Sequence, residues 1–332
     1  MPMSRRRALA GLACLPLASC ERDPAAPAAP PPAAVSWRDA LGPLDDVPPI
    51  LRPAFTDETD CAPLPPPGPH DWRTVQPEPP QTVADFLAAG PNVRTSPRDH
   101  IALLPLGRFP FEVLVGADLV GLVRSPPISV LAAVLAAFFA TPVDRLPTAP
   151  FPEPAIPSRV ASGHQQYDAR ALLLHVAGQL PANAHSMLML VNVDLHVNLA
   201  QQYTFGWSTL HERLGVVGFS RFDPSFHGGA APDDLQGTIL RRALRVAVHE
   251  VGHLFGIGHC QAFRCAMNGM AHLIELDALP LHLCPLCLRK LHHVASFDPR
   301  VRDHELLRTF TAVGLADDAA WYARRVARLW GS

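Results

Sequence analysis

Residues 249–259 read HEVGHLFGIGH, and this stretch decides how the rest of the chain is interpreted. On a helix, His249 and His253 lie one turn apart on the same face, so both imidazoles can reach a single metal ion. Gly256 stands where the helix should end, because glycine readily adopts the left-handed conformation common at helix ends. The chain can then turn back and deliver His259 as a third ligand. Three protein ligands with an open fourth position are typical of a catalytic zinc site.

Glu250 follows the first of these histidines directly and can hold a proton-accepting carboxylate beside a metal-bound water. The alternative is a surface helix that carries incidental histidines. The residue frequencies of the chain, taken over its 16 histidines, give a chance match of about 1 in 10,000 for the five fixed positions. The pattern therefore favours a zinc site with Glu250 as its general base.

Four cysteines follow the third histidine, arranged as a close pair and a CxxC: Cys260, Cys265, Cys284 and Cys287. Four thiolates in this grouping suit a tetrahedral structural zinc. Two disulfides among the same cysteines are the competing interpretation if the protein is exported to an oxidising compartment. A thiol titration before and after chelation separates the two interpretations.

Three motifs together resemble the archaemetzincin family of zinc peptidases: HExxHxxGxxHC at residues 249–260, CxM at 265–267 and CxxC at 284–287. Met267 resembles the Met-turn that lies beneath the metal in metzincins. The spacing between Met267 and the CxxC, residues 268–283, is one residue shorter than the family pattern, which we attribute to a loop deletion. Short matches, PLG at 105–107 and FGW at 205–207, extend the resemblance over about residues 99–295.

The resemblance implies an α/β, zincin- or metzincin-like single catalytic domain with a mixed sheet, a zinc-binding helix and a Met-turn, plus a subdomain that holds a structural zinc on four cysteines. It also implies a zinc metallopeptidase with two zinc ions per chain, one catalytic and one structural. The substrate would be a peptide or protein, and aminopeptidase and endopeptidase action both stay open. The alternative from another class is a catalytically idle, surface-tethered zinc-binding module. Glu250 argues against it, since an idle site does not need the base.

Apolar patterning predicts the elements that would carry this centre. We expect strands at 101–107 and 187–193, and a pair at 203–207 and 215–219. We expect helices at 128–140, 166–178, 235–255 and 316–330. A strand just before the zinc helix is where zincin-type peptidases add a peptide to a sheet edge.

Residues 1–20 resemble an export signal, with basic Arg5–Arg7 before a short apolar run that cannot span a bilayer. Leu17–Cys20 reads LASC and resembles a bacterial lipobox, in which Cys20 would be lipidated. Ser4–Leu9 also resembles a twin-arginine signal, which exports folded proteins. We expect an exported, membrane-anchored bacterial lipoprotein, periplasmic or on the cell surface. An ordinary secretory signal or a mispredicted start site are the alternatives.

Proline content divides the remaining chain, since many of the 37 prolines fall early. Residues 21–98 are predicted to be a Pro/Ala-rich tether and N-terminal extension with little regular structure beyond a short helix near 83–89. Residues 99–300 would form the catalytic domain, and 301–332 a helical segment packed on it. Cys61 is unpaired in this scheme, and a cysteine switch that silences the zinc is a minor hypothesis for it.

Composition narrows the partners. The chain is 48% hydrophobic and 17% charged with a net charge of −2, which allows a substantial core and argues against a nucleic-acid partner. We find no internal repeat, Walker motif or Rossmann glycine pattern. We expect a monomer that meets a peptide or protein substrate, and a membrane surface if Cys20 is modified.

Overall fold

The computed structural model describes residues 36–109, 125–197, 202–230 and 232–331. All described residues belong to one large compact unit. The expected export signal, Cys20 and the start of the tether therefore lie outside the described residues. No helix in the described part of the chain is both long and apolar enough to cross a membrane.

A five-stranded mixed sheet lies at the centre of the large unit, with the strand order β2-β1-β5-β8-β7. The strands are β2 (Val143–Arg145), β1 (His100–Leu106), β5 (Ala184–Val191), β8 (Leu214–Gly218) and β7 (Gly206–Thr209). Strands β2, β1, β5 and β8 are parallel, and β7 runs antiparallel to β8 at the edge, with Gly206 opposite Val217. All residues of β1, β5 and β8 are buried, which explains their nearly continuous apolar sequences.

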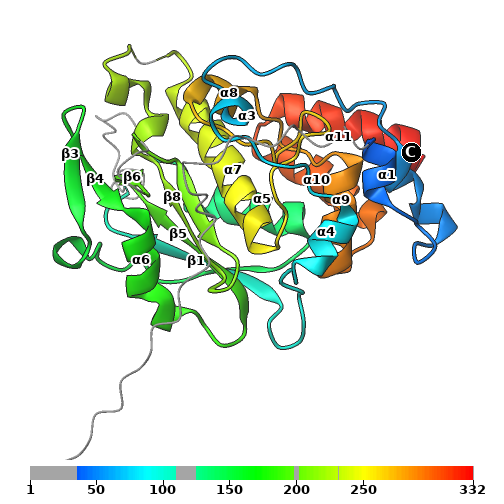
Figure 1. Cartoon of the computed structure of the whole chain (residues 1–332), viewed down its shortest axis with the longest axis horizontal. Coiled ribbons are helices and arrows are strands. Elements are labelled where there is room, and N and C mark those ends of the chain that lie inside the picture. Colours follow the sequence, from blue (N-terminus) through cyan, green and yellow to red (C-terminus); the bar gives the residue numbers. More distant parts are fainter. Residues whose placement is uncertain (1–35, 110–124, 198–201, 231, 332) are drawn as a thin grey trace, which may run out of the picture. The chain divides into compact units, whose positions relative to one another are not determined.

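Helices cover both faces of this sheet (Figure 1). Along β1, Ile101 and Leu103 belong to one hydrophobic core and Ala102 and Leu104 to another, as the two-residue period of a strand requires. The first core contains α5 (Ile128–Phe139) and α7 (Leu235–Leu254), and the second contains α6 (Ala169–Val176). The long helix α7 contacts β7 and β8 directly, which brings the histidine motif to the open edge of the sheet.

A second sheet, β3 (Ser158–Ala161), β4 (His164–Asp168) and β6 (Asp194–His196), corrects one prediction. The helix expected from Gln166 begins only at Ala169, because Gln166 to Asp168 pair with β6 instead. Asp168 caps the helix by accepting hydrogen bonds from the backbone amides of Arg170 and Ala171. The polar, half-exposed sequence of β3 and β4 carries too little apolar alternation to reveal them as strands.

The C-terminal part is helical: α8 (Leu273–Ala278), α9 (Pro285–Ala295), α10 (Pro299–Ala312) and α11 (Ala316–Leu329). The predicted 301–332 segment thus contains α11 and most of α10. Arg302 on α10 donates a hydrogen bond to the carbonyl of Phe138 at the end of α5 at 2.7 Å. Buried Asp303 accepts one from Arg325 on α11 at 2.8 Å. These contacts attach both helices to the sheet-bearing part of the unit.

The N-terminal extension contains more structure than its proline content suggests. Besides the short helix α4 (Val83–Ala88), it forms α1 (Trp37–Leu41), α2 (Pro53–Thr56) and α3 (Trp72–Val75). Phe55 and Phe86 are fully buried in the first core. Residues of the extension therefore contribute to the same hydrophobic core as α5 and α7. Each helix has only one or two turns, so no hydrophobic period could reveal it from the sequence.

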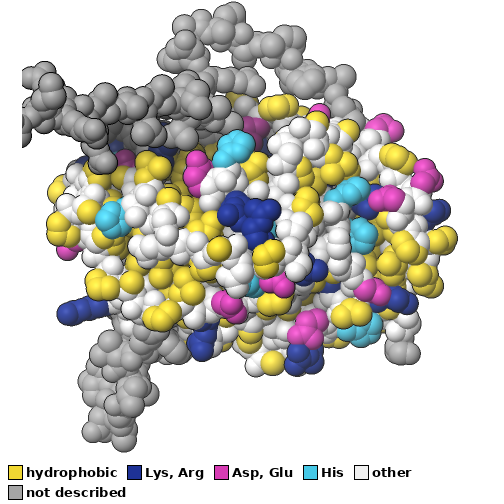
Figure 2. Space-filling model, turned by 90° about the horizontal axis from the view of Figure 1, so that it is seen from below, with side chains coloured by type: hydrophobic (Ala, Val, Ile, Leu, Met, Phe, Trp, Pro, Cys, Tyr) yellow, Lys and Arg dark blue, Asp and Glu magenta, His cyan; other side chains and the backbone are white. Residues whose placement is uncertain are grey.

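Short 3-10 helices complete the described chain: η1 (Pro49–Leu51), η2 (Glu153–Ala155), η3 (Ala177–Gln179), η4 (Ser220–Phe222) and η5 (Pro224–His227). Figure 2 shows that acidic, basic and apolar side chains are interspersed over the face of the molecule seen from below.

Candidate metal centre

Three histidines converge at the C-terminal end of α7. His249 and His253 are one turn apart on the helix, and their Nε2 atoms are 2.9 Å apart. Gly256 ends the helix with φ +93, and a Cβ there would lie 2.9 Å from Pro91 Cβ. Only glycine therefore suits this turn. The reversal brings His259 back, so that one ring nitrogen from each histidine lies within 4.8 Å of the others.

The orientation of each ring is set by a hydrogen bond at its Nδ1 atom. The three acceptors are Ala266 O for His249 at 3.1 Å, Ile257 O for His253 at 2.8 Å and Glu78 Oε1 for His259 at 2.9 Å. Since each Nδ1 carries the proton, each Nε2 presents a lone pair. Two lone pairs facing each other at 2.9 Å repel unless a cation lies between them, so this donor set fits a zinc ion.

Burial keeps the two helical histidines in the form that binds metal. It lowers the pKa of His253 to about 3 and that of His249 well below its ordinary value, with a further contribution from the neighbouring histidines. Neutral imidazole is the species that ligates zinc. The centre is therefore ready to take up a cation near neutral pH.

Glu250 is buried on the same helix, against the edge strand β7. Its Oε2 accepts a hydrogen bond of 2.6 Å from the hydroxyl of Ser208. Burial raises the pKa of Glu250 to about 8, and the bond from Ser208 opposes that rise. A bound divalent cation would lower it, because a nearby positive charge favours the carboxylate. Gly206 lies directly over this side chain: a Cβ there would be 2.6 Å from Oε1.

Met267 lies against α7 between the two helical histidines. It is fully buried, and a Cβ on Gly252 would lie 2.3 Å from its sulfur. Its backbone carbonyl accepts a hydrogen bond from the amide of Cys260 at 2.7 Å. The methionine therefore shapes the floor of the centre by packing, as expected of a Met-turn.

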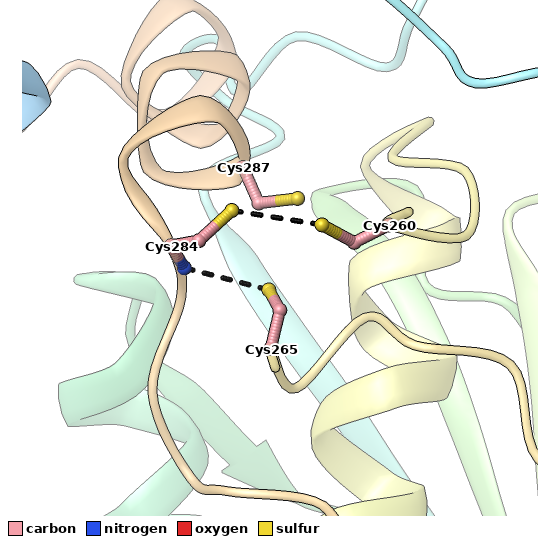
Figure 3. A group of neighbouring side chains, drawn as sticks. All are labelled: Cys260, Cys265, Cys284 and Cys287. Atoms are coloured by element: carbon pink, nitrogen blue, oxygen red, sulfur yellow. Dashed lines mark hydrogen bonds between the residues drawn. The ribbon is translucent and has the colours of Figure 1, made fainter. Parts of the chain in front are cut away.

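The four cysteines form a separate group at the start of α9, which we call the four-cysteine cluster. Figure 3 shows the sulfur atoms of Cys260, Cys265, Cys284 and Cys287 pointing into one space between α9 and the loop after α7. All four are buried free thiols, and Cys260 Sγ lies 3.6 Å from Cys284 Sγ. A disulfide requires about 2.05 Å. Of the two interpretations open from the sequence, this arrangement fits a tetrahedral metal site.

Comparisons with known proteins agree with this geometry. The sequence model of peptidase family M54 matches residues 187–293, which include both groups of ligands. Archaemetzincin-1 of Rattus norvegicus is 32% identical over 277 residues, covering 74% of this chain and 52% of the relative. Archaemetzincin-2 of Pongo abelii is 25% identical over 285 residues, covering 78% and 77%. The chain belongs to the archaemetzincin family. It is accordingly a zinc-dependent metallopeptidase of family M54.

Two solved archaemetzincin structures align over nearly their whole length with part of this chain. The protein from Methanopyrus kandleri aligns with 60% of this chain and 97% of its own, at 24% identity and a TM-score of 0.44. The protein from Archaeoglobus fulgidus, complexed with malonate, aligns with 57% of this chain and 99% of its own, at 21% identity and a TM-score of 0.42.

In this archaemetzincin, the sequence did not reveal three polar residues around the centre. Ser208 contacts the carboxylate of Glu250. Asn268 ties the Met-turn together by donating to the carbonyls of Cys260 and Phe263 at 2.8 and 2.9 Å. Glu78, from the predicted tether, accepts from His259. Burial raises the pKa of Glu78, but the hydrogen bonds from His259 and Trp72 and the charges of the nearby histidines together outweigh burial and lower this pKa. No motif marks these positions, because each acts through a contact made only in the fold.

A further group, Asp71, His272 and Glu275, also lies within 4.8 Å. Its polar atoms already form hydrogen bonds within the protein. Glu275 accepts from the backbone amides of Trp72 and Ala271 at 3.0 and 2.7 Å. His272 Nδ1 accepts from the Glu275 amide, so Nε2 carries the proton and faces Asp71 at 3.1 Å. This group joins the N-terminal extension to α8 and does not have the free lone pairs of a metal site.

Cys61 does not support the cysteine-switch hypothesis. Its side chain is buried, and burial raises its pKa to about 12. The segment that follows it pairs with the loop of the four-cysteine cluster: Arg264 N donates to Ala62 O at 2.9 Å, and Pro63 forms a bridge with Phe263. A buried neutral thiol held beside that loop is no ligand for the histidine centre.

Proposed function

We propose that this chain hydrolyses peptide bonds at a zinc ion held by His249, His253 and His259, with Glu250 as the general base. The observation that carries the proposal is the convergence of three Nε2 lone pairs, each oriented by a bond at Nδ1, beside a buried carboxylate. A zinc ion at this place supplies Lewis-acid polarisation of the substrate carbonyl and makes water a stronger acid.

Glu250 accepts the proton of the attacking water and returns it to the departing amine. The hydroxyl of Ser208 holds Oε2 in place, which leaves Oε1 to exchange protons. Burial of this carboxylate strengthens its interaction with a developing positive charge, since few water molecules compete. Its position on the same helix as two ligands fixes it relative to the metal.

The substrate would add to the open edge of β7. This strand pairs with β8 on one side, and within the described residues it is the last strand of the sheet. A peptide chain that pairs with β7 passes Gly206 and Ser208, both of which contact or face Glu250. Backbone hydrogen bonds of this kind bind an extended peptide with little dependence on its side chains.

We further propose a second zinc ion on the four-cysteine cluster, with a structural role. Four buried thiols that share one space support it, because such sites close all four positions with protein ligands. When the protein is denatured in the presence of a metal chelator, we expect a thiol reagent to react with all four cysteines of the cluster. If no reactive thiols appear after chelation, the four cysteines form disulfides instead.

For the N-terminal segment we propose an exported, membrane-anchored monomer, lipidated at Cys20. The lipobox-like LASC at 17–20 supports this, and export of the folded chain by the twin-arginine route would keep the cluster thiols protected. Mass spectrometry of the mature N-terminus in a bacterial host tests it. If the chain is exported and Cys20 is unmodified, residues 1–20 act as an ordinary secretory signal without a lipid anchor.

Digestion of a peptide library tests the proposed function, with the purified chain used as isolated, after chelation, and after zinc is restored. We expect cleavage in the first and third samples, and mass spectrometry of the products will distinguish amino-terminal trimming from internal cuts. Absence of cleavage by a chain that demonstrably holds its zinc would favour the alternative, a zinc-binding module with a metzincin fold.

A further inference from the structure

Residues 68–81 of the N-terminal extension run beside the third histidine, and we call this segment the strap. Both carboxylate oxygens of Glu78 lie 2.9 Å from His259 Nδ1. The indole Nε1 of Trp72 donates to the same carboxylate at 2.9 Å. The Trp72 ring also meets the His259 ring edge-on, with centroids 4.9 Å apart. The imidazole is therefore held on two sides by this one segment.

The strap is fastened to the loop that carries His259. Gln81 accepts from the amide of Gly258 at 2.9 Å and donates to the carbonyl of Gly256 at 3.3 Å. Gln261 donates to the backbone carbonyl of Glu78 at 2.5 Å. The residues on either side of His259 are thus hydrogen-bonded to the same short segment.

Contacts away from the loop hold the strap itself. Lys290 on α9, almost fully buried, donates to the backbone carbonyl of Gln81 at 2.6 Å. The Trp72 ring lies so close to Gly269 that a Cβ on that glycine would be 2.2 Å from it. The backbone amide of Trp72 is bound by the carboxylate of Glu275 at 3.0 Å. Because the strap is anchored at these points, it can fix the position of the His259 side chain that it contacts.

The three ligands differ in what orients them. The Nδ1 partners of His249 and His253 are backbone carbonyls from the loop and turn that follow α7. The partner of His259 is a side-chain carboxylate 181 positions upstream. A carboxylate at this place fixes which nitrogen carries the proton, turns Nε2 toward the metal and makes the imidazole a stronger donor.

We propose that Glu78 is a positioning residue of the zinc centre, and that the N-terminal extension is thereby a working part of that centre and neither a tether nor a removable pro-segment. The inference rests on the proposed function, since it concerns the same metal. It assigns the orientation of His259 to the carboxylate of Glu78, with Trp72 holding that carboxylate.

The test is the zinc affinity of the histidine centre, measured by chelator competition on the full chain with Glu78→Ala, Glu78→Gln and Glu58→Ala. Glu58 is the matched control: it is a glutamate of the same extension whose side chain is 40% exposed, against 38% for Glu78, and it pairs with Arg38 at 2.8 Å. The thiol count of each sample reports the four-cysteine cluster separately. Loss of outer partners of this kind costs about 10- to 100-fold in metal affinity.

We expect Glu78→Ala to bind zinc at the histidine centre about 10- to 100-fold more weakly, with Glu78→Gln between it and the wild type and Glu58→Ala unchanged. Affinity of Glu78→Ala within twofold of the wild type would overturn the proposal. If Glu78→Ala does not fold, wild-type affinity in Glu78→Gln overturns it instead. A wild-type chain without zinc on its histidines would refute the proposed function itself, which separates the two failures.

Discussion

Gly206 offers a way to displace the proposed base without touching it. The residue lies at the start of β7, and a Cβ added there would be 2.6 Å from Glu250 Oε1 and 2.7 Å from the carboxyl carbon. The carboxylate cannot swing aside freely, because Ser208 holds its other oxygen at 2.6 Å and the side chain is buried. Gly206→Ala must therefore move the carboxylate, the strand or both.

The size of the effect follows from these distances. Non-bonded heavy atoms settle at about 3.5 Å or more, so relief of a 2.6 Å contact requires a shift of about 1 Å. A misplacement of about 1 Å in a catalytic group costs on the order of 100-fold in rate. We expect kcat to fall by about that factor, while zinc stays bound, since the ligands are oriented by other contacts.

The assay is steady-state cleavage of one peptide found by library digestion, with zinc content measured on the same samples. Gly178→Ala is the matched control, because nothing lies within 4 Å of a Cβ there and its φ is not positive. It should leave the rate unchanged. A Gly206→Ala protein with wild-type kcat would refute the placement of Glu250 as the base.

Three further predictions concern packing, charge and pH. Gly252→Ala would place a Cβ 2.3 Å from the Met267 sulfur; we expect a loss of about 1–3 kcal/mol from overpacking in urea unfolding, partly recovered when Met267→Ala is added. Asp303→Ala would leave buried Arg325 without its carboxylate, and we expect a loss of about 3–5 kcal/mol; a change below 1 kcal/mol would contradict this. Burial lowers the pKa of His185 to about 4. The stability that neutral His185 contributes is complete above pH 6.5 and is lost as the pH falls toward 4, because the unfolded chain binds the proton at a higher pH than the folded chain does. His185→Gln should therefore remove about 3 kcal/mol of the acid dependence of the free energy of unfolding.

The sequence predicted best where one short stretch determines a local geometry. The ligand spacing on α7 and the stop at Gly256 needed only helical periodicity and one glycine. Strands β1, β5 and β8 were found as apolar runs because both of their faces are covered. The α/β class and the mixed sheet followed from these elements together with the resemblance.

Three helices of the N-terminal extension, α1, α2 and α3, were missed because their order comes from distant contacts. Two short helices of the extension, α2 and α4, bury the large side chains of Phe55 and Phe86 in a core formed with residues far along the chain. Asp46 pairs with Arg289 on α9 at 2.6 Å, and Glu78 reaches His259. Contacts between positions so far apart produce no periodic pattern in a single sequence. The proline content was the only signal available, and it suggested a tether.

The most direct measurement is the turnover of one peptide by zinc-loaded wild-type protein and by zinc-loaded Glu250→Gln. The glutamine keeps the shape of the side chain and its bond from Ser208 but cannot accept the proton of water near neutral pH. We expect kcat to fall by about 100- to 10,000-fold with equal zinc content. Equal turnover by the two proteins would contradict the proposed role of Glu250 and, with it, the mechanism.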